Sequence, residues 1–271
     1  DYVTIRQAPG TLIVVEGSLQ ATLDKLVADE IFEDVKSITS LELKGQLSDA
    51  DWNLLKDMTH STKGYSLKTL NLAEVTNTRM KENAFNNGKD MSILQSIVFP
   101  GNLEFVPANV CDGFSALTSA RILEGVEYLD HHAFKNCTNL QEIWLPGTLT
   151  YIYGYCFEQC TRISKIHLRS KPVQIYQVVR SAPQQQTWAT TFQGSLPKTA
   201  TLYIFRDYVD YYKNPDPQHV ASRHLGDYLK GLKANSPEWL EKTPAFDYKH
   251  GEIVKNNFSW TNSATNIVAE D

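Results

Sequence analysis

Four clustered cysteines and two adjacent histidines are the side chains in this 271-residue sequence with the most chemical potential. The cysteines lie within 50 residues of one another, at Cys111, Cys137, Cys156 and Cys160. Cys156 and Cys160 form a C-x3-C pair, but no second pair of ligands follows at the distance that a four-ligand zinc site needs. His131 and His132 would suit metal ligation or acid–base work. We predict no metal site from either group.

Enzyme signatures are absent from the sequence. It contains no H-E-x-x-H, no G-x-S-x-G, no G-x-G-x-x-G and no Walker loop. With 26 Lys and Arg against 31 Asp and Glu, the net charge of -5 and the lack of a basic run argue against nucleic acid as a partner. No apolar stretch approaches the roughly 20 residues that span a bilayer. We expect no catalytic activity, no cofactor and no transmembrane segment, and interpret a sequence that begins at Asp1 as a mature or trimmed chain.

A period of 23 residues organises the middle of the sequence, where four apolar columns repeat over four copies. The columns are Leu94, Leu117, Leu140 and Ile163; Ile97, Ala120, Ile143 and Ile166; Phe99, Ile122, Leu145 and Leu168; and Val106, Leu129, Ile152 and Ile175. Weaker copies at 38–45, 67–72 and 191–205 extend the repetitive body to residues 38–205. A unit this short cannot bury its own apolar face, so the period predicts the stacked coils of a solenoid.

Each coil is predicted to contain one short strand. The alternation in "LQEIWLP", residues 140–146, points Ile143 and Leu145 inward and Glu142 and Trp144 outward. The Pro-Gly at 146–147 then ends the strand and turns the chain. Seven such strands in parallel would form a sheet roughly 30 Å wide.

The outward positions of this sheet are the candidate ligand-binding residues. One column reads Glu42, Asn71, Val98, Arg121, Trp144, His167 and Tyr203, and its neighbour reads Thr69, Ser96, Ser119, Glu142 and Lys165. Trp, Tyr and Arg are enriched at binding hot spots, and aromatic rings among polar groups also suit sugars. The predicted site consists of Arg121, Glu142, Trp144, Lys165, His167 and Tyr203. Alternatively, these side chains form cross-strand ladders that only stabilise the sheet, or the cap and tail cover this face.

The period also bears on the cysteines and histidines. Cys137 and Cys160 are one period apart and should stack in adjacent coils, near enough for a disulfide as the alternative to reduced, buried thiols, which we favour. His131 and His132 match the turn that precedes the aromatic position of the repeat, which Phe134 and Phe157 occupy in adjacent coils. They are therefore predicted to be polar turn residues.

The unit "AFKNCTNLQEIWLPGTLTYI", residues 133–152, resembles the BspA-like leucine-rich repeats of bacterial surface proteins. Their coil reads roughly A-F-x-x-C-x-x-L-x-x-I-x-L-P-x-x-L-x-x-I. Nine positions agree: Ala133, Phe134, Cys137, Leu140, Ile143, Leu145, Pro146, Leu149 and Ile152. The resemblance implies an α/β repeat solenoid, a right-handed coil with a short-stranded parallel sheet on one face, an irregular or short-helical other face, and terminal caps.

The same resemblance implies an exported protein on the bacterial cell surface, attached to the outer membrane or secreted, with a lipid anchor upstream as one mode of attachment. Such proteins serve adhesion or recognition, and the family contributes no catalytic residues. The partner would be a host or bacterial surface protein or a glycan. One alternative is a structural spacer without a ligand site, and another is an accessory module of a secreted enzyme. The oligomeric state stays open.

Three segments frame or interrupt the repeats. Residues 1–37 are predicted to form an N-terminal cap of a strand and a helix, with Ser18 as the helix N-cap. The insertion at 176–199 breaks the period, and its Gln-rich centre is interpreted as a surface loop. Residues 206–271 are predicted to hold a cap helix at 219–232 and a tail, in which 246–260 form either a hairpin or an extended arm.

Overall fold

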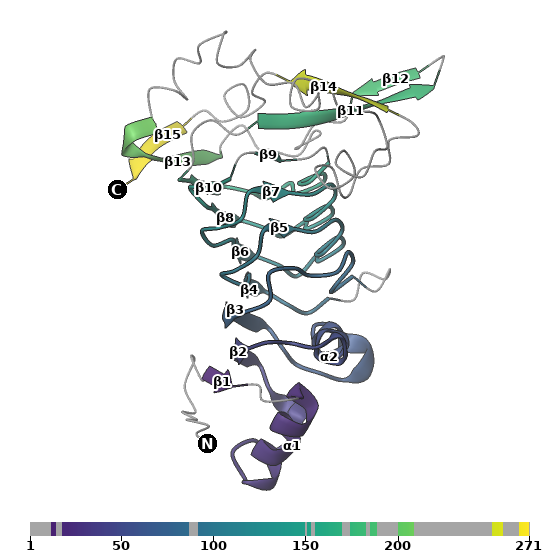
Figure 1. Ribbon diagram of the computed structural model, residues 1–271, viewed down its shortest axis with the longest axis vertical. Helices are drawn as coiled ribbons and strands as arrows, with labels where there is room; N and C mark the ends of the chain where they lie inside the picture. The colour runs from purple at the N-terminus through teal and green to yellow at the C-terminus, as the bar shows by residue number, and fades with distance from the viewer. Residues whose placement is uncertain are drawn as a thin grey trace.

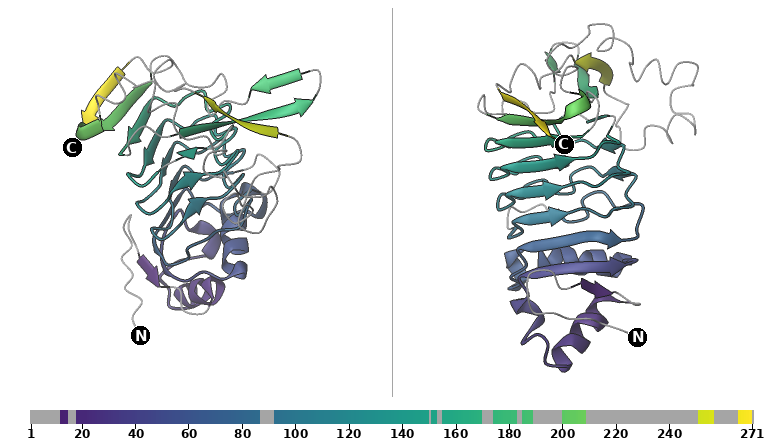
Figure 2. Two further views of the ribbon diagram at one scale, coloured as in Figure 1. Left: turned by 45° about the horizontal axis from the view of Figure 1, so that its top comes forward. Right: turned by 90° about the vertical axis from the view of Figure 1, so that its left-hand side faces the viewer.

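The protein is an elongated stack of coils (Figure 1). The computed structural model describes residues 12–14, 18–86, 92–149, 151–152, 155–169, 174–182, 185–188, 200–208, 251–256 and 266–270, with the backbone alone at 12–14, 151, 174–182, 185–188, 202, 205, 208, 251–256 and 266–267. The N-terminal helices lie at one end of the stack and the C-terminal strands at the other (Figures 1 and 2). The predicted solenoid is confirmed.

One side of the stack is a parallel sheet that takes one strand from each coil (Figure 2). In spatial order, its strands are β1 (Leu12–Val14), β2 (Ser40–Gly45), β3 (Thr69–Val75), β4 (Ser96–Val98), β6 (Ser119–Arg121), β8 (Glu142–Leu145), β10 (Lys165–Leu168), β13 (Thr201–Phe205) and β15 (Asn266–Glu270). The seven predicted strands are all present, and β1 and β15 extend the sheet at its two ends. Residues one period apart pair directly, as in Arg121 with Trp144 and Trp144 with His167.

A second, narrower sheet lies on another side of the coils. Its strands are β5 (Phe105–Val106), β7 (Tyr128–Leu129), β9 (Tyr151–Ile152), β11 (Gln174–Ala182), β12 (Gln185–Trp188) and β14 (Gly251–Asn256). The sequence-based expectation of an irregular or short-helical remainder missed this sheet. Two-residue strands are too short to show an alternating pattern, so only the buried row of Val106, Leu129 and Ile152 marks them in the sequence.

The third side of the coils consists of turns that use the left-handed backbone region at fixed positions. One such column holds Asn109, His132 and Tyr155, with φ of 55°, 59° and 60°. The other holds Gly113, Asn136 and Gln159, with φ of 80°, 59° and 64°. Gly, Asn and His tolerate this region better than most residues. His131 and His132 are therefore turn residues, as predicted.

The core is continuous along the stack because each coil buries its apolar columns against the next. Phe134 is fully buried, with its ring stacked on Phe157 at 5.5 Å between centroids and edge-on to Phe99 at 5.8 Å. Trp52 takes the aromatic position of an early copy and packs edge-on against Phe85 at 5.9 Å. This row of rings fills the part of the core that the side chains of the short strands do not fill.

All four cysteines are buried, and none of them forms a disulfide. The Cys137 thiol donates to the Cys111 carbonyl oxygen at 3.1 Å, and the Cys160 thiol donates to the Phe134 carbonyl oxygen at 3.0 Å. Burial raises the pKa of the Cys111 and Cys156 thiols. The Cys137 and Cys160 thiols therefore connect neighbouring turns through weak hydrogen bonds. The raised pKa makes Cys111 and Cys156 poor nucleophiles.

The N-terminal end is closed by two helices that share one carboxylate. They are α1 (Leu19–Ala28) and α2 (Asp49–Met58), and short 3-10 turns follow at η1 (Val35–Ser37) and η2 (Ser61–Lys63). Ser18 caps α1, as predicted. Asp51 completes a capping box with Ser48 on α2 and accepts from the Leu19 N–H of α1 at 2.7 Å while only 2% exposed.

The insertion departs from the prediction, and the tail adds a strand to the second sheet. The Gln-rich part of 176–199 is not a loop, because β11 and β12 pair antiparallel there. In the tail, where a hairpin or an extended arm was predicted at 246–260, the described residues 251–256 form the extended strand β14, which pairs antiparallel with β11. A last 3-10 turn, η3 (Arg206–Tyr208), follows β13. The helix predicted at 219–232 lies outside the described residues.

Replacing Phe134 by Ala should lower the free energy of unfolding by about 3–5 kcal/mol, because it empties a fully buried ring site between two other rings. Urea unfolding followed by circular dichroism measures the loss. The control is Thr138→Ala, at an exposed turn position of the same coil, which should stay within about 0.5 kcal/mol. Equal losses at the two positions would contradict the packing described here.

The thiols give a second prediction for the core. All four should react with a thiol reagent in urea under non-reducing conditions, and none should react quickly in the native protein, because each is buried. Absorbance of the released thiolate gives the count. Two reactive thiols in the denatured protein would show that one disulfide is present and would contradict this prediction.

Candidate recognition surface on the large sheet

Three rings form a continuous stack on the outward face of the large sheet. Trp144 on β8, His167 on β10 and Tyr203 on β13 occupy paired positions on adjacent strands. The His167 ring lies 4.9 Å from that of Trp144 at an interplanar angle of 9°, and 4.6 Å from that of Tyr203 at 12°. The rings therefore stand on the sheet face to face, and each inner face is covered by the next ring. We call this group the aromatic ladder.

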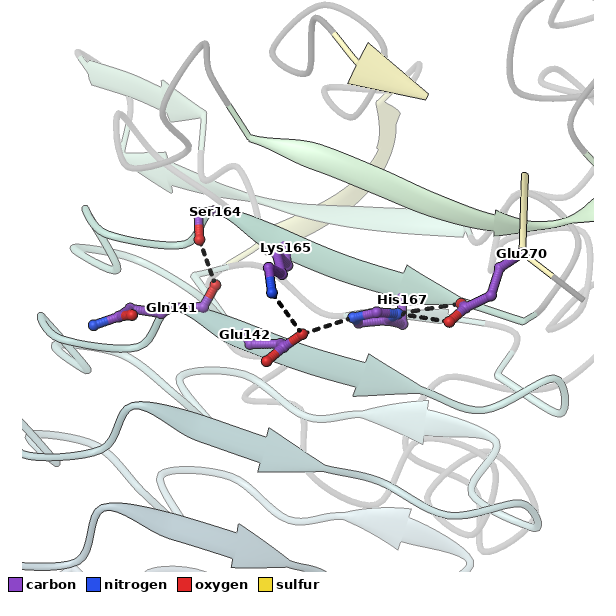
Figure 3. A network of polar contacts seen from close by, with 6 residues as sticks. All are labelled: Gln141, Glu142, Ser164, Lys165, His167 and Glu270. Carbon is purple, nitrogen blue, oxygen red and sulfur yellow. Dashed lines mark hydrogen bonds and ion pairs between the residues drawn. The ribbon is translucent and has the colours of Figure 1, made fainter. Parts of the chain in front are cut away.

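Two carboxylates hold the middle ring of the ladder. His167 Nε2 lies 3.0 Å from Glu142 Oε1, and His167 Nδ1 lies 3.0 and 3.2 Å from the two carboxylate oxygens of Glu270 (Figure 3). Both ring nitrogens of His167 therefore face carboxylate oxygens. With a carboxylate at each nitrogen and a ring on each face, His167 is only 8% exposed. It lies on the predicted face but is not open to a ligand in this arrangement.

Glu142 links the ladder to Lys165. The Lys165 ammonium lies 3.5 Å from Glu142 Oε1, the same oxygen that faces His167 (Figure 3). The side chain of Lys165 is 49% exposed and that of Glu142 is 26% exposed. Such a pair fixes side-chain positions more than it stabilises the fold, since partly exposed ion pairs contribute little free energy.

The ladder is open at the Trp144 end. The ring is half-buried, and its outer face is turned towards β6, where Arg121 pairs with it in register. Arg121 is exposed, and among the described residues its guanidinium has no hydrogen bond, ion pair or ring contact. The structure thus brings the six predicted residues onto one face, with Arg121 and Trp144 accessible, Glu142, Lys165 and Tyr203 partly engaged, and His167 enclosed.

Glu270 is the residue of this surface that sequence reasoning missed. It lies 103 positions beyond His167, on a strand that follows no 23-residue period. The short run "NIVAE", residues 266–270, is the only signal that could have pointed to a strand there, and nothing in it predicts the pairing with β13. Long-range contacts of this kind leave no local pattern.

The other candidate cluster, around His131, is a structural turn. His131 Nδ1 lies 2.8 Å from Asp130 Oδ1, and the Asp130 carboxylate is 1% exposed. Burial of the ring opposes its charge, but the hydrogen bond and negative charge of Asp130 outweigh it and raise the pKa of His131. Within the described part of the chain, no group of three His, Cys, Asp or Glu side chains is placed to hold a metal ion.

The period, the strand that each coil adds to the large parallel sheet and the buried columns define a leucine-rich repeat solenoid. Residues 60–179 match, in six copies, the family model described as "BspA type Leucine rich repeat region". The resemblance to BspA-type leucine-rich repeats that the sequence motif predicts is confirmed for these residues. The family is associated with bacterial surface proteins, is typically non-catalytic, and points to recognition of protein partners.

Other comparisons add little to the family assignment. A solved structure described as "Structure of the Toll - Spatzle complex, a molecular hub in Drosophila development and innate immunity" matches 71% of this chain and 36% of that chain, at 15% identity and a TM-score of 0.27. The chain thus spans about a third of the matched protein. No curated protein matches the chain significantly. Among the described residues, no helix has the length and apolar character to cross a membrane.

Replacing Trp144 by Ala should lower the free energy of unfolding by about 1–2 kcal/mol, since the ring is half-buried and one face stacks on His167. The loss should be well below that of Phe134→Ala, because no closed cavity is left. Urea unfolding of the two variants in the same buffer makes the comparison. A loss at Trp144 as large as at Phe134 would place the indole in the core rather than on the recognition surface.

Proposed function

We propose that the chain is a non-catalytic recognition module that binds a protein through the outward face of the large sheet, centred on Arg121 and Trp144. The observation that carries the proposal is the open end of the aromatic ladder, where an exposed guanidinium with no partner among the described residues stands beside a half-buried indole. Arg and Trp are the residue types that contribute most to binding hot spots.

The ladder supports binding at this end by fixing Trp144 before a ligand arrives. Its ring is held by His167, which is held in turn by Tyr203, Glu142 and Glu270. A side chain already fixed in its bound position loses less conformational entropy on association. Arg121, in contrast, has its full donor set available for a carboxylate or a backbone carbonyl of the partner.

A protein partner suits this surface better than a glycan. Sugars bind by lying on an aromatic face, but the ladder covers both faces of His167 and one face of Trp144 with neighbouring rings. A protein can use ring edges, the guanidinium and the flanking hydroxyls of Ser96 and Ser119, which bond to each other at 3.0 Å. The proposal places the module on a bacterial surface, attached to the outer membrane or through a lipid anchor, as in the family.

The test is a binding screen with the full chain against immobilised matrix, serum and bacterial surface proteins and a glycan array. For a protein that binds, Arg121→Ala and Trp144→Ala should each lower the affinity about tenfold or more. Matched controls are Arg162→Ala, at an exposed turn bonded to Asn139, and Tyr128→Ala, in a ring stack of the second sheet. Both should stay within about twofold of the wild type.

Three outcomes would count against the proposal. Equal losses in the controls would mean that binding does not use the large sheet, and binding to glycans alone would contradict a protein partner. A complete panel without any binder would favour the spacer, in which the ladder serves only to stabilise the sheet.

A further inference from the structure

The strand β15 is the last strand of the large sheet among the described residues. It pairs in parallel with β13 over five residues, from Thr201 with Asn266 to Phe205 with Glu270. Of its described side chains, Val268 is 43% exposed, Ala269 is exposed, and Glu270 is half-buried. The described contacts of the strand are its backbone pairing with β13 and the polar contact of Glu270 with His167.

The Glu270 anchor is specific because its carboxylate contacts β10, whereas β15 itself pairs with β13. It pairs with Phe205 on β13, yet its carboxylate lies on His167 of β10, one strand further into the sheet (Figure 3). Both carboxylate oxygens are within 3.2 Å of the same ring nitrogen. His167 thus presents Nδ1 to the open end of the sheet while Glu142 occupies Nε2.

We propose that the edge of β13, together with His167, is a binding site for an extended acidic peptide strand of a partner protein, and that β15 occupies this site as an internal ligand. The incoming strand would pair in parallel with β13 and place a carboxylate where Glu270 now lies. Strand addition to a sheet edge draws affinity from main-chain hydrogen bonds and specificity from side-chain anchors. A charge-assisted bond to His167 is such an anchor.

This inference rests on the proposed function, because it names a second point of contact for the same partner. The strand site and the Arg121–Trp144 end lie at opposite ends of the aromatic ladder. A partner that supplies a carboxylate to each would be held along the ladder between them. Displacement of β15 is required only for the strand site, so the two contacts can be tested separately.

The test uses the full chain and a fluorescently labelled peptide with the sequence of residues 264–271, "ATNIVAED", read by fluorescence anisotropy. In the wild type, β15 competes from within the same molecule and keeps the measured affinity low. Glu270→Gln weakens this competitor, so the peptide should bind about tenfold more tightly to the variant. The matched control is Glu124→Gln, whose carboxylate accepts from the N–H groups of Gly147 and Thr148 and does not contact the ladder. It should bind the peptide as the wild type does.

The role of the carboxylate is tested with a second peptide that carries Gln at the position of Glu270. On the Glu270→Gln chain, it should bind about tenfold more weakly than the first peptide, and His167→Gln in that chain should remove the difference. Equal affinity for the two peptides on the Glu270→Gln chain, or no binding of either, would overturn the proposal.

Hydrogen exchange gives a readout on the wild type that does not depend on any variant. Excess peptide should accelerate exchange of the amides of 266–270, since the displaced strand loses its pairing with β13. Unchanged exchange at saturating peptide would also overturn the proposal. If the peptide does not bind while Arg121→Ala and Trp144→Ala still lower the affinity for a protein partner, the strand site is contradicted and the recognition surface is supported. If the peptide binds but those two variants leave the affinity for a protein partner unchanged, the proposed function is contradicted instead.

Discussion

The structure depends on one constraint, which is that a 23-residue coil can bury its apolar face only against the next coil. This forces residues one period apart into direct register, because any slip would take the buried columns out of the core. The constraint also shapes the outer face. Strands in a sheet lie about 4.8 Å apart, so rings at one outward position meet at stacking distance, as the 4.6 and 4.9 Å spacings of the ladder show. The core therefore positions the recognition surface without contacting a ligand.

The stack that fixes the ladder also limits what it can bind. Each ring that stacks loses a face, and each carboxylate that holds His167 removes a donor from the surface. What remains free is at the Trp144 end, where β6 supplies Arg121 instead of another ring. A ring in place of Arg121 would extend the ladder by one rung and cover the outer face of Trp144. The change from aromatic to cationic side chain between two rungs therefore creates the accessible part of the surface.

The features that recur with the period were predictable from the sequence, and those that do not recur were not. Trp144, His167 and Tyr203 could be assigned to one outward column because the period itself sets their register. Burial of His167 could not be predicted, since it results from Glu270, a residue outside the repeats. The strands at 105–106 and 128–129 are too short for an alternating pattern, and the polar hairpin of β11 and β12 lacks one.

The two ends of the solenoid are closed by different interactions. At the N-terminal end, α1 and α2 bury Leu19, Leu23 and Leu26, and the 2% exposed carboxylate of Asp51 joins the two helices through backbone donors. Opening that end would expose core residues and an unpaired carboxylate, both at high cost. At the other end, the described side chains of β15, at 268–270, are exposed or half-buried, and the Glu270 carboxylate contacts His167. The two ends also differ in what anchors the outermost strand, because the carboxylate of β15 on His167 is a contact that the carboxylate of a partner strand can reproduce. We therefore place exchange with a partner strand at β13.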